Sequence, residues 1–353
     1  MQKVTILCVG KLKEKLICVG KLKEKFYIDA AAEYVKRLSR FCKLELVELP
    51  EERLPEDPSP AQIEAALDHS KYDITVIDLH GRDWHHTAPD GRQWQVDKND
   101  FSITVDGVRK AFDYALIIIH GTPGEDGKLQ GYLDMMGVPY SSCSMVSSVI
   151  TFDKITTKRT LAGRGINLAR EVFLRRGEAF DAARIVADLG LPLFVKPNAN
   201  GSSFGVTKVH APEELPAAIE AAFAQECIAG REMGCGVMIA GGKEYLFPIT
   251  EIIPRKEFFD YEAKYTAGRS EEITPSDIAP EVKAELNRMT LEAYRTCRCS
   301  GVVRVDFIVT PEGRPYFIEL NSIPGMSAGS IVPKQVRAMG MTLGELFDIV
   351  IDD

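Results

Sequence analysis

The chain has 353 residues, of which 45% are hydrophobic and 27% charged, and its formal net charge is −8. This length and composition indicate an ordinary globular protein of two or three domains and argue against disorder. The acidic balance argues against broad nucleic-acid binding. Because no stretch reaches the ~18 apolar residues of a membrane helix and no signal-peptide core is present, we expect a cytoplasmic location.

The first 45 residues differ from the rest of the chain in charge. They hold 11 Lys/Arg against 5 Asp/Glu and are therefore +6, so the remaining residues carry −14. This stretch also contains a tandem repeat, ILCVGKLKEK over residues 6–15 and LICVGKLKEK over residues 16–25. One copy predicts a strand, a glycine turn and a basic segment, so the two copies compete for one place in a sheet. The repeat is too short for a solenoid and indicates a duplication.

The chain beyond the repeat predicts a helix over residues 26–42, a strand over Leu44–Leu49 and then a proline-punctuated linker. The cysteines show no CxxC pair and no ligand spacing typical of zinc, so we interpret them as reduced thiols. They are Cys8, Cys18, Cys42, Cys143, Cys227, Cys235, Cys297 and Cys299.

A new pattern begins after the linker. Residues 72–79 predict a strand, residues 81–100 a loop or hairpin with both tryptophans, and the apolar residues 113–120 a parallel strand covered on both faces. From Thr151 helices and strands alternate in an α/β and α+β plan. The predicted helices cover residues 154–164, 212–225, 279–297 and a segment near the C-terminus, and the predicted strands lie at 193–196, 206–210, 237–239, 245–253, 302–310 and 316–320.

Two glycine-rich segments follow predicted strands. His120 opens HGTPGEDGKLQG, whose glycines let backbone N–H groups approach an anion, although such a strand exit is often only a turn. Lys196 ends the strand that opens VKPNANGSSFG, which suits a loop folded over phosphates. The alternative for the second segment is a surface hairpin with an exposed lysine. Lys154 and Lys158 supply further cations, which favours the phosphate-binding interpretation.

Acidic and amide groups near the C-terminus predict a metal site. Asp306 in VRVDF and Glu319 in FIELN would lie on adjacent antiparallel strands, with Asn321 just beyond. Two carboxylates and an amide oxygen are hard ligands that suit Mg²⁺ bridging ATP phosphates. The alternative is an outward charged face, but both acids have apolar neighbours, where unpaired carboxylates are unfavourable. Two further segments, residues 261–265 and 321–330, predict a mobile loop and a set of backbone donors beside the metal.

From His69 to the C-terminus these motifs, taken in order, resemble D-alanine-D-alanine ligases. The motifs are HGTPGEDGKLQG, VKPNANGSSFG, DYEAKY, VRVDF and FIELNSIPGMSAGS. The resemblance implies an ATP-grasp fold with a preceding α/β N-terminal domain, and ATP held between two α+β domains. It also implies that ATP and the first D-alanine form an acyl phosphate, which the amine of a second D-alanine attacks, for peptidoglycan precursor synthesis. Mg²⁺ or Mn²⁺ is the expected cofactor, D-alanine the substrate and a homodimer the expected assembly; neither nucleic acid nor membrane is expected as a partner of the ligase part.

The resemblance also implies roles for individual residues. Lys154 and Lys196 would bind phosphates, Glu232 the ribose, and Asp306, Glu319 and Asn321 the metal ions. Arg304 and Gly325 would stabilise the transferring phosphoryl group and the tetrahedral intermediate. His120, Ser202, Tyr265, Lys264 and Ser330 would position substrate and close the lid, with Lys264 counted among the nucleotide-binding residues. Tyr265 resembles the dipeptide-forming rather than the depsipeptide-forming members.

Two departures from the family pattern accompany this match. The family's opening glycine-rich strand exit, with a glutamate for the first substrate's amine, has no counterpart here. Residues 1–67, with one repeat removed, instead resemble the start of the SPOUT-class 23S ribosomal RNA pseudouridine methyltransferase family. A helix is also predicted to run directly to Gln225, so the family's adenine-contacting strand before Glu226 is expected to be absent.

These observations give four expected segments and three competing functions. Residues 1–67 form the methyltransferase-like leader, 68–150 the incomplete ligase N-terminal domain, 151–233 the central ATP-grasp subdomain and 234–353 the C-terminal one. The alternatives to D-alanine ligation are an ATP-grasp ligase for another carboxylate and amine, an RNA-binding or RNA-modifying protein led by the basic N-terminus, and a catalytically impaired fusion that keeps the ligase fold.

Overall fold

The chain divides into two compact units, residues 1–58 and residues 59–353. The computed structural model describes residues 14–19, 44–49, 59–174, 178–199, 206–219, 223–254 and 270–353. Within these ranges no helix combines the length and apolarity needed to cross a membrane. The predicted helix over residues 26–42 lies outside the described residues.

The first unit contains a parallel pair of strands, β1 (Glu14–Val19) and β2 (Leu44–Leu49). The bounds of β2 are those predicted from the sequence. Strand β1 combines the end of the first repeat copy with the start of the second, and Leu16 pairs with Leu46. The second copy therefore takes the place in the sheet for which the two copies compete, and the 24 residues between the strands suffice for the crossover that a parallel pair requires.

The second unit begins with helix α2 (Ser59–Ala66), which precedes the expected end of the leader. Ile63 and Leu67 are buried in one apolar cluster with Leu346 and Phe347 of the C-terminal helix α11 (Leu343–Asp352). Residues 59–67 therefore pack with the second unit, and the division between the units lies earlier than the boundary at residue 67.

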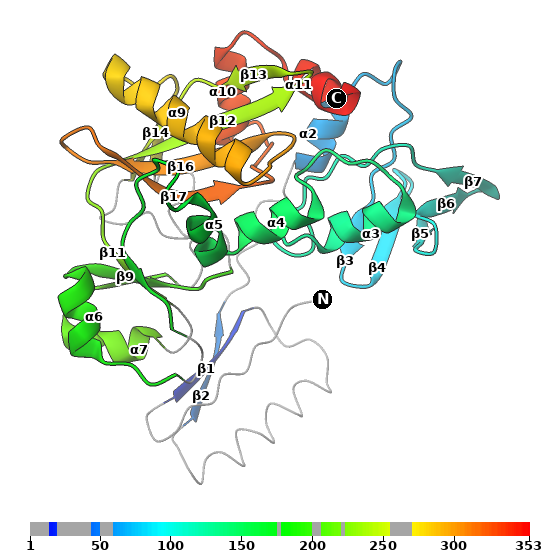
Figure 1. The fold of residues 1–353 in the computed structure, drawn as a ribbon. Helices are drawn as coiled ribbons and strands as arrows, with labels where there is room; N and C mark the ends of the chain where they lie inside the picture. Colours follow the sequence, from blue (N-terminus) through cyan, green and yellow to red (C-terminus); the bar gives the residue numbers. More distant parts are fainter. Residues whose placement is uncertain are drawn as a thin grey trace. The chain divides into compact units, whose positions relative to one another are not determined.

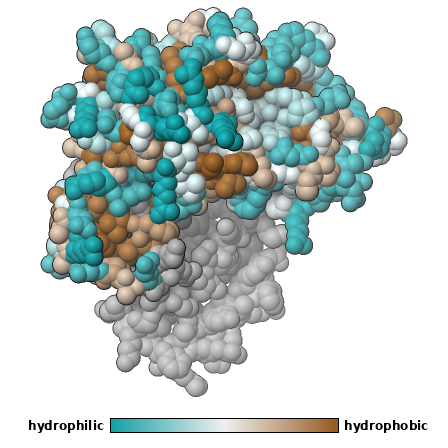
Figure 2. Space-filling view, viewed as in Figure 1, coloured by the Kyte–Doolittle hydropathy of each residue, from teal (hydrophilic) through white to brown (hydrophobic). Residues whose placement is uncertain are grey.

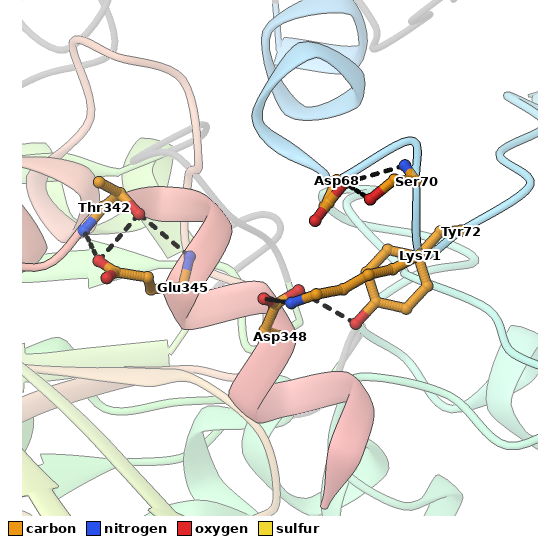
Figure 3. Close-up of polar contacts among 7 residues, drawn as sticks. All are labelled: Asp68, Ser70, Lys71, Tyr72, Thr342, Glu345 and Asp348. Carbon is orange, nitrogen blue, oxygen red and sulfur yellow. Dashed lines mark hydrogen bonds and ion pairs between the residues drawn. The ribbon is translucent and has the colours of Figure 1, made fainter.

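Polar contacts also join the C-terminal helix α11 to the segment that follows α2 (Figure 3). Lys71 and Tyr72 both point toward Asp348 on α11, with Lys71 Nζ 2.5 Å from Oδ2 and Tyr72 Oη 3.0 Å from Oδ1. Helix α11 starts with a capping box, in which Thr342 Oγ1 accepts from Glu345 N while the Glu345 carboxylate accepts from Thr342 N. Such a cap satisfies backbone donors that a helix start otherwise leaves unpaired.

A six-stranded antiparallel sheet forms the largest layer of the second unit (Figure 1). Its order is β15-β14-β12-β16-β17, with β13 paired to β12. The strands are β12 (Arg231–Ala240), β13 (Lys243–Leu246), β14 (Thr250–Pro254), β15 (Ser270–Ile273), β16 (Val303–Val309) and β17 (Pro315–Asn321). Strands were predicted in most of these segments, although β12 begins well before Val237.

One face of this sheet is apolar and is covered by helix α9 (Pro280–Thr296) (Figure 1). Met233, Val305 and Phe307 point to α9, where they meet Met289 and Leu286. Since side chains alternate along a strand, residues 234, 304 and 306 lie on the opposite face. Helix α10 (Ile331–Ala338) packs on that side, where Gln335 Nε2 donates to Gly234 O at 2.8 Å.

A second, four-stranded antiparallel sheet has the order β10-β9-β11-β8. Its strands are β8 (Glu171–Val172), β9 (Leu193–Lys196), β10 (Thr207–Val209) and β11 (Phe223–Glu226), and the helices α5 (Lys154–Leu161), α6 (Ala182–Leu189), η1 (Pro212–Glu214) and α7 (Leu215–Ile219) accompany them in the chain. The core of this layer joins Leu193 and Val195 to Ile185 and Leu215.

The helix predicted over residues 212–225 is wrong at its C-terminal end. Helix α7 ends at Ile219, and β11 pairs with β9 on one side and β8 on the other. The expectation that helix continues up to Glu226 without a strand is therefore also wrong. The alanine-rich sequence favours helix locally, but pairing with two strands satisfies the backbone of residues 223–226 on both edges and decides the outcome.

The N-terminal part of the second unit is a five-stranded antiparallel meander. It comprises β3 (Asp78–His80), β4 (Asp83–Thr87), β5 (Gln93–Asp97), β6 (Ser102–Val105) and β7 (Val108–Ala111). The hairpin predicted over residues 81–100 is confirmed as β4 and β5. Trp84 packs edge-on against Phe101 and against Tyr132, which belongs to helix α3 (Lys128–Met136). The ring centroids of Trp84 and Tyr132 are 5.1 Å apart.

The strands predicted over residues 72–79 and 113–120 form only in part. Only the end of the segment 72–79 belongs to a strand, β3. In the segment 113–120, Ala115 makes one parallel bridge to Tyr140. Burial on both faces is nevertheless confirmed, because Leu116 and Ile118 join the cluster of α11 while Ile117 joins that of α3. A parallel strand needs hydrogen-bonding neighbours, and the described residues supply only the Tyr140 bridge.

We expect Phe307→Ala to lower the free energy of unfolding by about 3–5 kcal/mol, the usual cost of removing a buried phenyl ring. Phe307 is fully buried and packs edge-on against Phe317, with 6.2 Å between ring centroids. Urea unfolding followed by far-UV circular dichroism measures the loss. Val108→Ala, at a position with 63% of its surface exposed, is the control and should unfold at the wild-type midpoint. Equal midpoints for both variants would contradict the packing described here.

Candidate functional site

The polar face of the large sheet carries the predicted metal ligands. In the register of β16 and β17, Asp306 lies opposite Glu319 and Arg304 opposite Asn321. Directly opposed residues share a face, as do residues two apart on one strand. All four side chains therefore lie on the same face, and Asp306 and Glu319 lie on adjacent antiparallel strands as the sequence predicted.

Asp306 is the most buried member of this group, with 4% of its surface exposed. Its carboxylate accepts from Arg304 Nε at 2.8 Å and Nη2 at 2.9 Å, and from Asn321 Nδ2 at 2.9 Å. Burial alone would lower the pKa of Arg304, but the charges of Asp306 and Glu319 raise it above its usual range. Arg304 is thus a fixed cation among carboxylates, in a geometry that strengthens charge-assisted bonds.

Gly234 lies next to this group on the neighbouring strand β12. It pairs with Asp306, and a Cβ atom there would lie 3.5 Å from both Arg304 Cδ and Asp306 Oδ1. Glu232, two residues earlier on β12, shares this face and pairs with Ile308. Its charge also contributes to the raised pKa of Arg304, so the predicted ribose-binding residue belongs to the same electrostatic group.

Lys154 reaches this group from the start of helix α5. The Asp153 side chain caps that helix by accepting from Thr156 N at 2.7 Å. Asn198, which follows β9, accepts from Lys154 N and Ile155 N at 3.2 Å and 3.0 Å. These bonds hold the helix start against the turn, and Lys154 Nζ lies 3.7 Å from Glu319 Oε2. The structure therefore brings a predicted phosphate-binding lysine beside a predicted metal ligand.

Lys196 ends β9 with 8% of its surface exposed. Burial, together with the charges of Lys158 and Lys154, lowers its pKa to about 7. Lys158 is itself buried, and its Nζ lies 2.7 Å from Glu171 Oε2. A lysine that shares a desolvated region with two other cations gains most from an anion, which is the arrangement expected of a polyphosphate site.

Glu125 is a site residue to which the sequence assigned no role. Its carboxylate accepts from Gly121 N at 2.6 Å, while Glu125 N donates to Gly121 O at 2.7 Å, so the two residues close the glycine-rich turn. Burial, reinforced by the charge of Glu319, raises the pKa of Glu125 to about 7. The sequence feature that could have indicated this role is the position of Glu125 inside HGTPGEDGKLQG, because a carboxylate among glycines can accept hydrogen bonds from the backbone of the turn.

Glu125 also lines a small pocket at the junction of helix α4 (Met145–Phe152), α5 and β17. Lys154, Glu319 and Asn321 face the same pocket. Its remaining lining residues are Thr151, Phe152, Thr157, Phe317, Ile318, Leu320 and Ser322. The glycine-rich turn, the first turn of α5 and strand β17 therefore enclose one polar hollow.

A second group joins three residues that the sequence predicted would act on substrate. A Cβ atom at Gly325 would lie 2.7 Å from Ser330 Oγ and 3.8 Å from His120 Nε2. Ser330 precedes α10, and its Oγ lies 2.8 Å from Ser327 Oγ. His120, Gly325 and Ser330 are therefore neighbours, and glycine is required for them to approach so closely. Ser202, Lys264 and Tyr265 lie outside the described residues.

The donor set fits a hard divalent cation. Asp306 and Glu319 supply carboxylate oxygens and Asn321 an amide oxygen, which is the ligand chemistry that Mg²⁺ prefers. Magnesium is normally held by one or two carboxylates plus phosphate oxygens and waters. The described part of the chain contains no cluster of three or more His, Cys, Asp or Glu side chains suited to a metal ion. The basic side chains nearby suit the accompanying phosphates.

Two family models match the second unit. Residues 58–143 match the D-ala D-ala ligase N-terminus and residues 161–352 match the D-ala D-ala ligase C-terminus. Among curated relatives, D-alanine-D-alanine ligase of Phocaeicola vulgatus is 41% identical over 294 residues, which are 81% of this chain and 90% of the relative. The enzyme of the same name from Parabacteroides distasonis is 42% identical over 81% of this chain and 89% of the relative.

Solved structures of similar proteins agree with these matches. The VanG D-Ala:D-Ser ligase from Enterococcus faecalis has a TM-score of 0.74 at 29% identity, covering 83% of this chain and 93% of that one. D-alanine-D-alanine ligase from Bacillus anthracis complexed with ATP has a TM-score of 0.59 at 28% identity, covering 96% of this chain and 95% of that one. These likenesses confirm the predicted ATP-grasp fold.

We expect polyphosphate binding to take up protons above neutral pH. The pKa of Lys196 is about 7 in the structure described, so this amine is largely neutral at pH 8. An anion beside it would raise that pKa and draw in up to one proton. Isothermal titration calorimetry with MgATP at pH 8, in two buffers of different ionisation enthalpy, measures the uptake. Lys196→Met should reduce it, whereas Lys243→Met, which alters a lysine stacked on Tyr245, should not. Equal uptake by both variants would contradict this assignment.

Proposed function

The chain belongs to the D-alanine-D-alanine ligase family, and on that basis we propose that it joins two D-alanine molecules in an ATP-dependent reaction. The product, D-alanyl-D-alanine, would serve peptidoglycan precursor synthesis. ATP and the carboxylate of the first D-alanine would form an acyl phosphate, and the amine of the second would then displace phosphate. The observation that supports this reaction best is the register that puts Asp306 opposite Glu319 on one face, with Lys154 beside Glu319.

The nucleotide would be held by residues from both sheets. We assign phosphate contacts to Lys154 and Lys196, the ribose contact to Glu232, and a nucleotide contact within the lid to Lys264. The burial of Lys196 and the distance from Lys154 to Glu319 support the first two assignments. Strand β11 lies between β8 and β9, and its presence supports an adenine contact from the segment that follows it. Gln225, with 3% of its surface exposed, is fixed in that strand.

Asp306, Glu319 and Asn321 would hold Mg²⁺ or Mn²⁺. The metal would supply charge neutralisation between the phosphates, which lowers the barrier to nucleophilic attack on phosphorus. Arg304 would stabilise charge on the transferred phosphoryl group, and its bidentate contact with Asp306 keeps the guanidinium in one orientation. Because these donors are fixed before reaction, little reorganisation is needed when charge develops.

The substrate end of the site would be formed by His120, Gly325 and Ser330, together with Ser202 and Tyr265. The closeness of the first three supports this assignment. Gly325 would offer its backbone N–H to the tetrahedral intermediate. The residue has to be glycine, because a side chain there would collide with Ser330 Oγ. Glu125 would keep the turn after His120 closed through its reciprocal bonds with Gly121.

The first unit has a separate proposed origin. Its resemblance to the SPOUT-class methyltransferase N-terminus is supported by the parallel pairing of β1 and β2 across 24 intervening residues, as in a βαβ unit. We assign no methyltransferase activity to it, because that family's methyl-donor site lies in a later part of its chain.

The assembly we propose is a homodimer, supported by an apolar surface on α4. Figure 2 shows a hydrophobic patch near the centre of the visible face, over α4 in the orientation of Figure 1. Met145, Val146 and Val149 are 42%, 54% and 50% exposed, and their spacing puts them on one side of the helix. Exposed apolar side chains that cluster in this way mark interaction surfaces.

The ligation reaction is tested by coupled phosphate release over a panel containing D-alanine, D-serine, D-lactate and L-alanine. Phosphate release should require D-alanine, with D-alanyl-D-alanine identified by mass spectrometry. Asp306→Asn and Glu319→Gln should each lower kcat by at least about 100-fold, because metal coordination and transition-state charge are lost together. Asp90→Asn, at an exposed carboxylate paired with Arg92, is the matched control and should keep full activity.

Three outcomes would contradict parts of this proposal. Activity only with amino acids other than D-alanine would reject the substrate. Absence of phosphate release with every amino acid, while MgATP still raises the unfolding temperature, would show a fold that binds nucleotide without ligation. Tight, salt-sensitive retention of ribosomal RNA on filters, without ligation, would favour the RNA-binding alternative.

The homodimer is tested by light scattering coupled to size-exclusion chromatography. Wild type should elute with twice the chain mass of 39.1 kDa. Val146→Glu combined with Val149→Glu should shift the protein to monomer, because two desolvated charges would oppose each apolar contact. Phe173→Glu, at another exposed apolar position, serves as the matched control. A wild-type monomer, or a double variant that stays dimeric, would exclude this α4 interface.

A further inference from the structure

Three cysteines meet where two distant segments of the second unit are joined. Residues 141–144 lead into α4, and residues 297–301 connect α9 to β16. Ser300 Oγ donates to Ser142 O at 3.0 Å, and Ser147 Oγ donates to Arg298 O at 2.7 Å. At Gly301 a Cβ atom would lie 2.1 Å from Ser141 O. The two segments therefore run in close backbone contact.

The thiols of Cys143 and Cys299 hydrogen-bond to each other across this contact. Cys143 is fully buried, and its Sγ also lies 3.5 Å from Ser300 O. Cys299 is only partly buried and is flanked by the exposed residues Arg298 and Ser300. Because the two segments run in close backbone contact and both cysteines belong to one apolar cluster, the pair is placed to form a disulfide. The exposed flank gives a small oxidant a route to the pair.

The surroundings distinguish the two thiols chemically. The hydrogen bond from Cys299 lowers the pKa of Cys143, and the same bond, together with burial, raises that of Cys299. Cys297, the third cysteine of the group, has 1% of its surface exposed, and burial raises its pKa to about 12. Since the thiolate is the nucleophile, Cys143 is the member suited to attack and Cys299 the member suited to resolve.

We propose that Cys143 and Cys299 form an oxidation site, at which hydrogen peroxide converts the two thiols into a reversible disulfide. The Cys143 thiolate attacks one peroxide oxygen, the O–O bond breaks, and hydroxide leaves and takes up the thiol proton as water. The sulfenic acid so formed on Cys143 is attacked by the Cys299 sulfur, which loses its proton while the second water departs. Two thiols and one peroxide thus give one disulfide and two waters.

The crosslink would connect the two segments that deliver the ligand-binding residues. Residues 143–153 carry α4 to Lys154, and residues 299–303 lead directly to Arg304. A covalent bond at their contact would limit separation of these segments during unfolding and so stabilise the native state. This inference rests on the cysteine geometry and is independent of the ligase activity proposed above.

The test treats the full chain with hydrogen peroxide and counts thiols under denaturing conditions. The eight cysteines of the reduced protein should fall to six titratable thiols, and dithiothreitol should restore eight. Peptide mapping by mass spectrometry should find Cys143 joined to Cys299, and the oxidised protein should unfold at a higher temperature than the reduced one. Cys299→Ser should abolish both the crosslink and the temperature shift.

Cys227→Ser is the matched control, because Cys227 is a partly exposed cysteine outside this group. It should leave the Cys143–Cys299 crosslink and the temperature shift unchanged. Retention of all eight thiols, or a crosslink that joins Cys143 to Cys297 instead, would overturn the proposal. Sulfinic acid on Cys143 without a disulfide would overturn it as well, because it would show that Cys299 does not resolve the sulfenic acid.

Discussion

The antiparallel pairing of β16 with β17 is the constraint on which the rest of the site depends. This pairing puts Asp306, Glu319, Arg304 and Asn321 on one face of a sheet whose other face is buried under α9. Two carboxylates in such a place would repel each other and lose hydration. Arg304 compensates by bonding both oxygens of Asp306, and Lys154 approaches Glu319 from a separate element.

The surrounding structure keeps those cations in position. Asn198 binds the start of α5 and thereby joins Lys154 to the turn after Lys196. Gly325 allows Ser330 and His120 to lie close together, because a Cβ atom there would collide with Ser330 Oγ. Glu125 closes its turn beside the same pocket. A polyphosphate and a divalent cation would therefore bind among several charges that are already fixed in position. Such preorganisation is what makes electrostatic catalysis effective.

Two segments of the second unit, residues 113–120 and 223–226, form less or different regular structure than their sequences predict. The segment over residues 113–120 keeps its burial on both faces although it makes only one bridge, to Tyr140, among the described residues. Strand β11 completes its sheet with only four residues, which lie between β8 and β9. In both places apolar packing and available hydrogen-bond partners, rather than local propensity, determine how much regular structure forms.

The sequence by itself determined the family, the β9, β16 and β17 segments and the residue types of the site, because motif order and strand alternation are local properties. It placed the predicted metal ligands Asp306 and Glu319 on adjacent strands because only a short turn separates the two segments. Tertiary structure alone decided that residues 113–120 lack a full ladder, that residues 223–226 form a strand instead of a helix, and that Cys143 meets Cys299. Each of these outcomes depends on a partner distant in the chain, which no local pattern specifies.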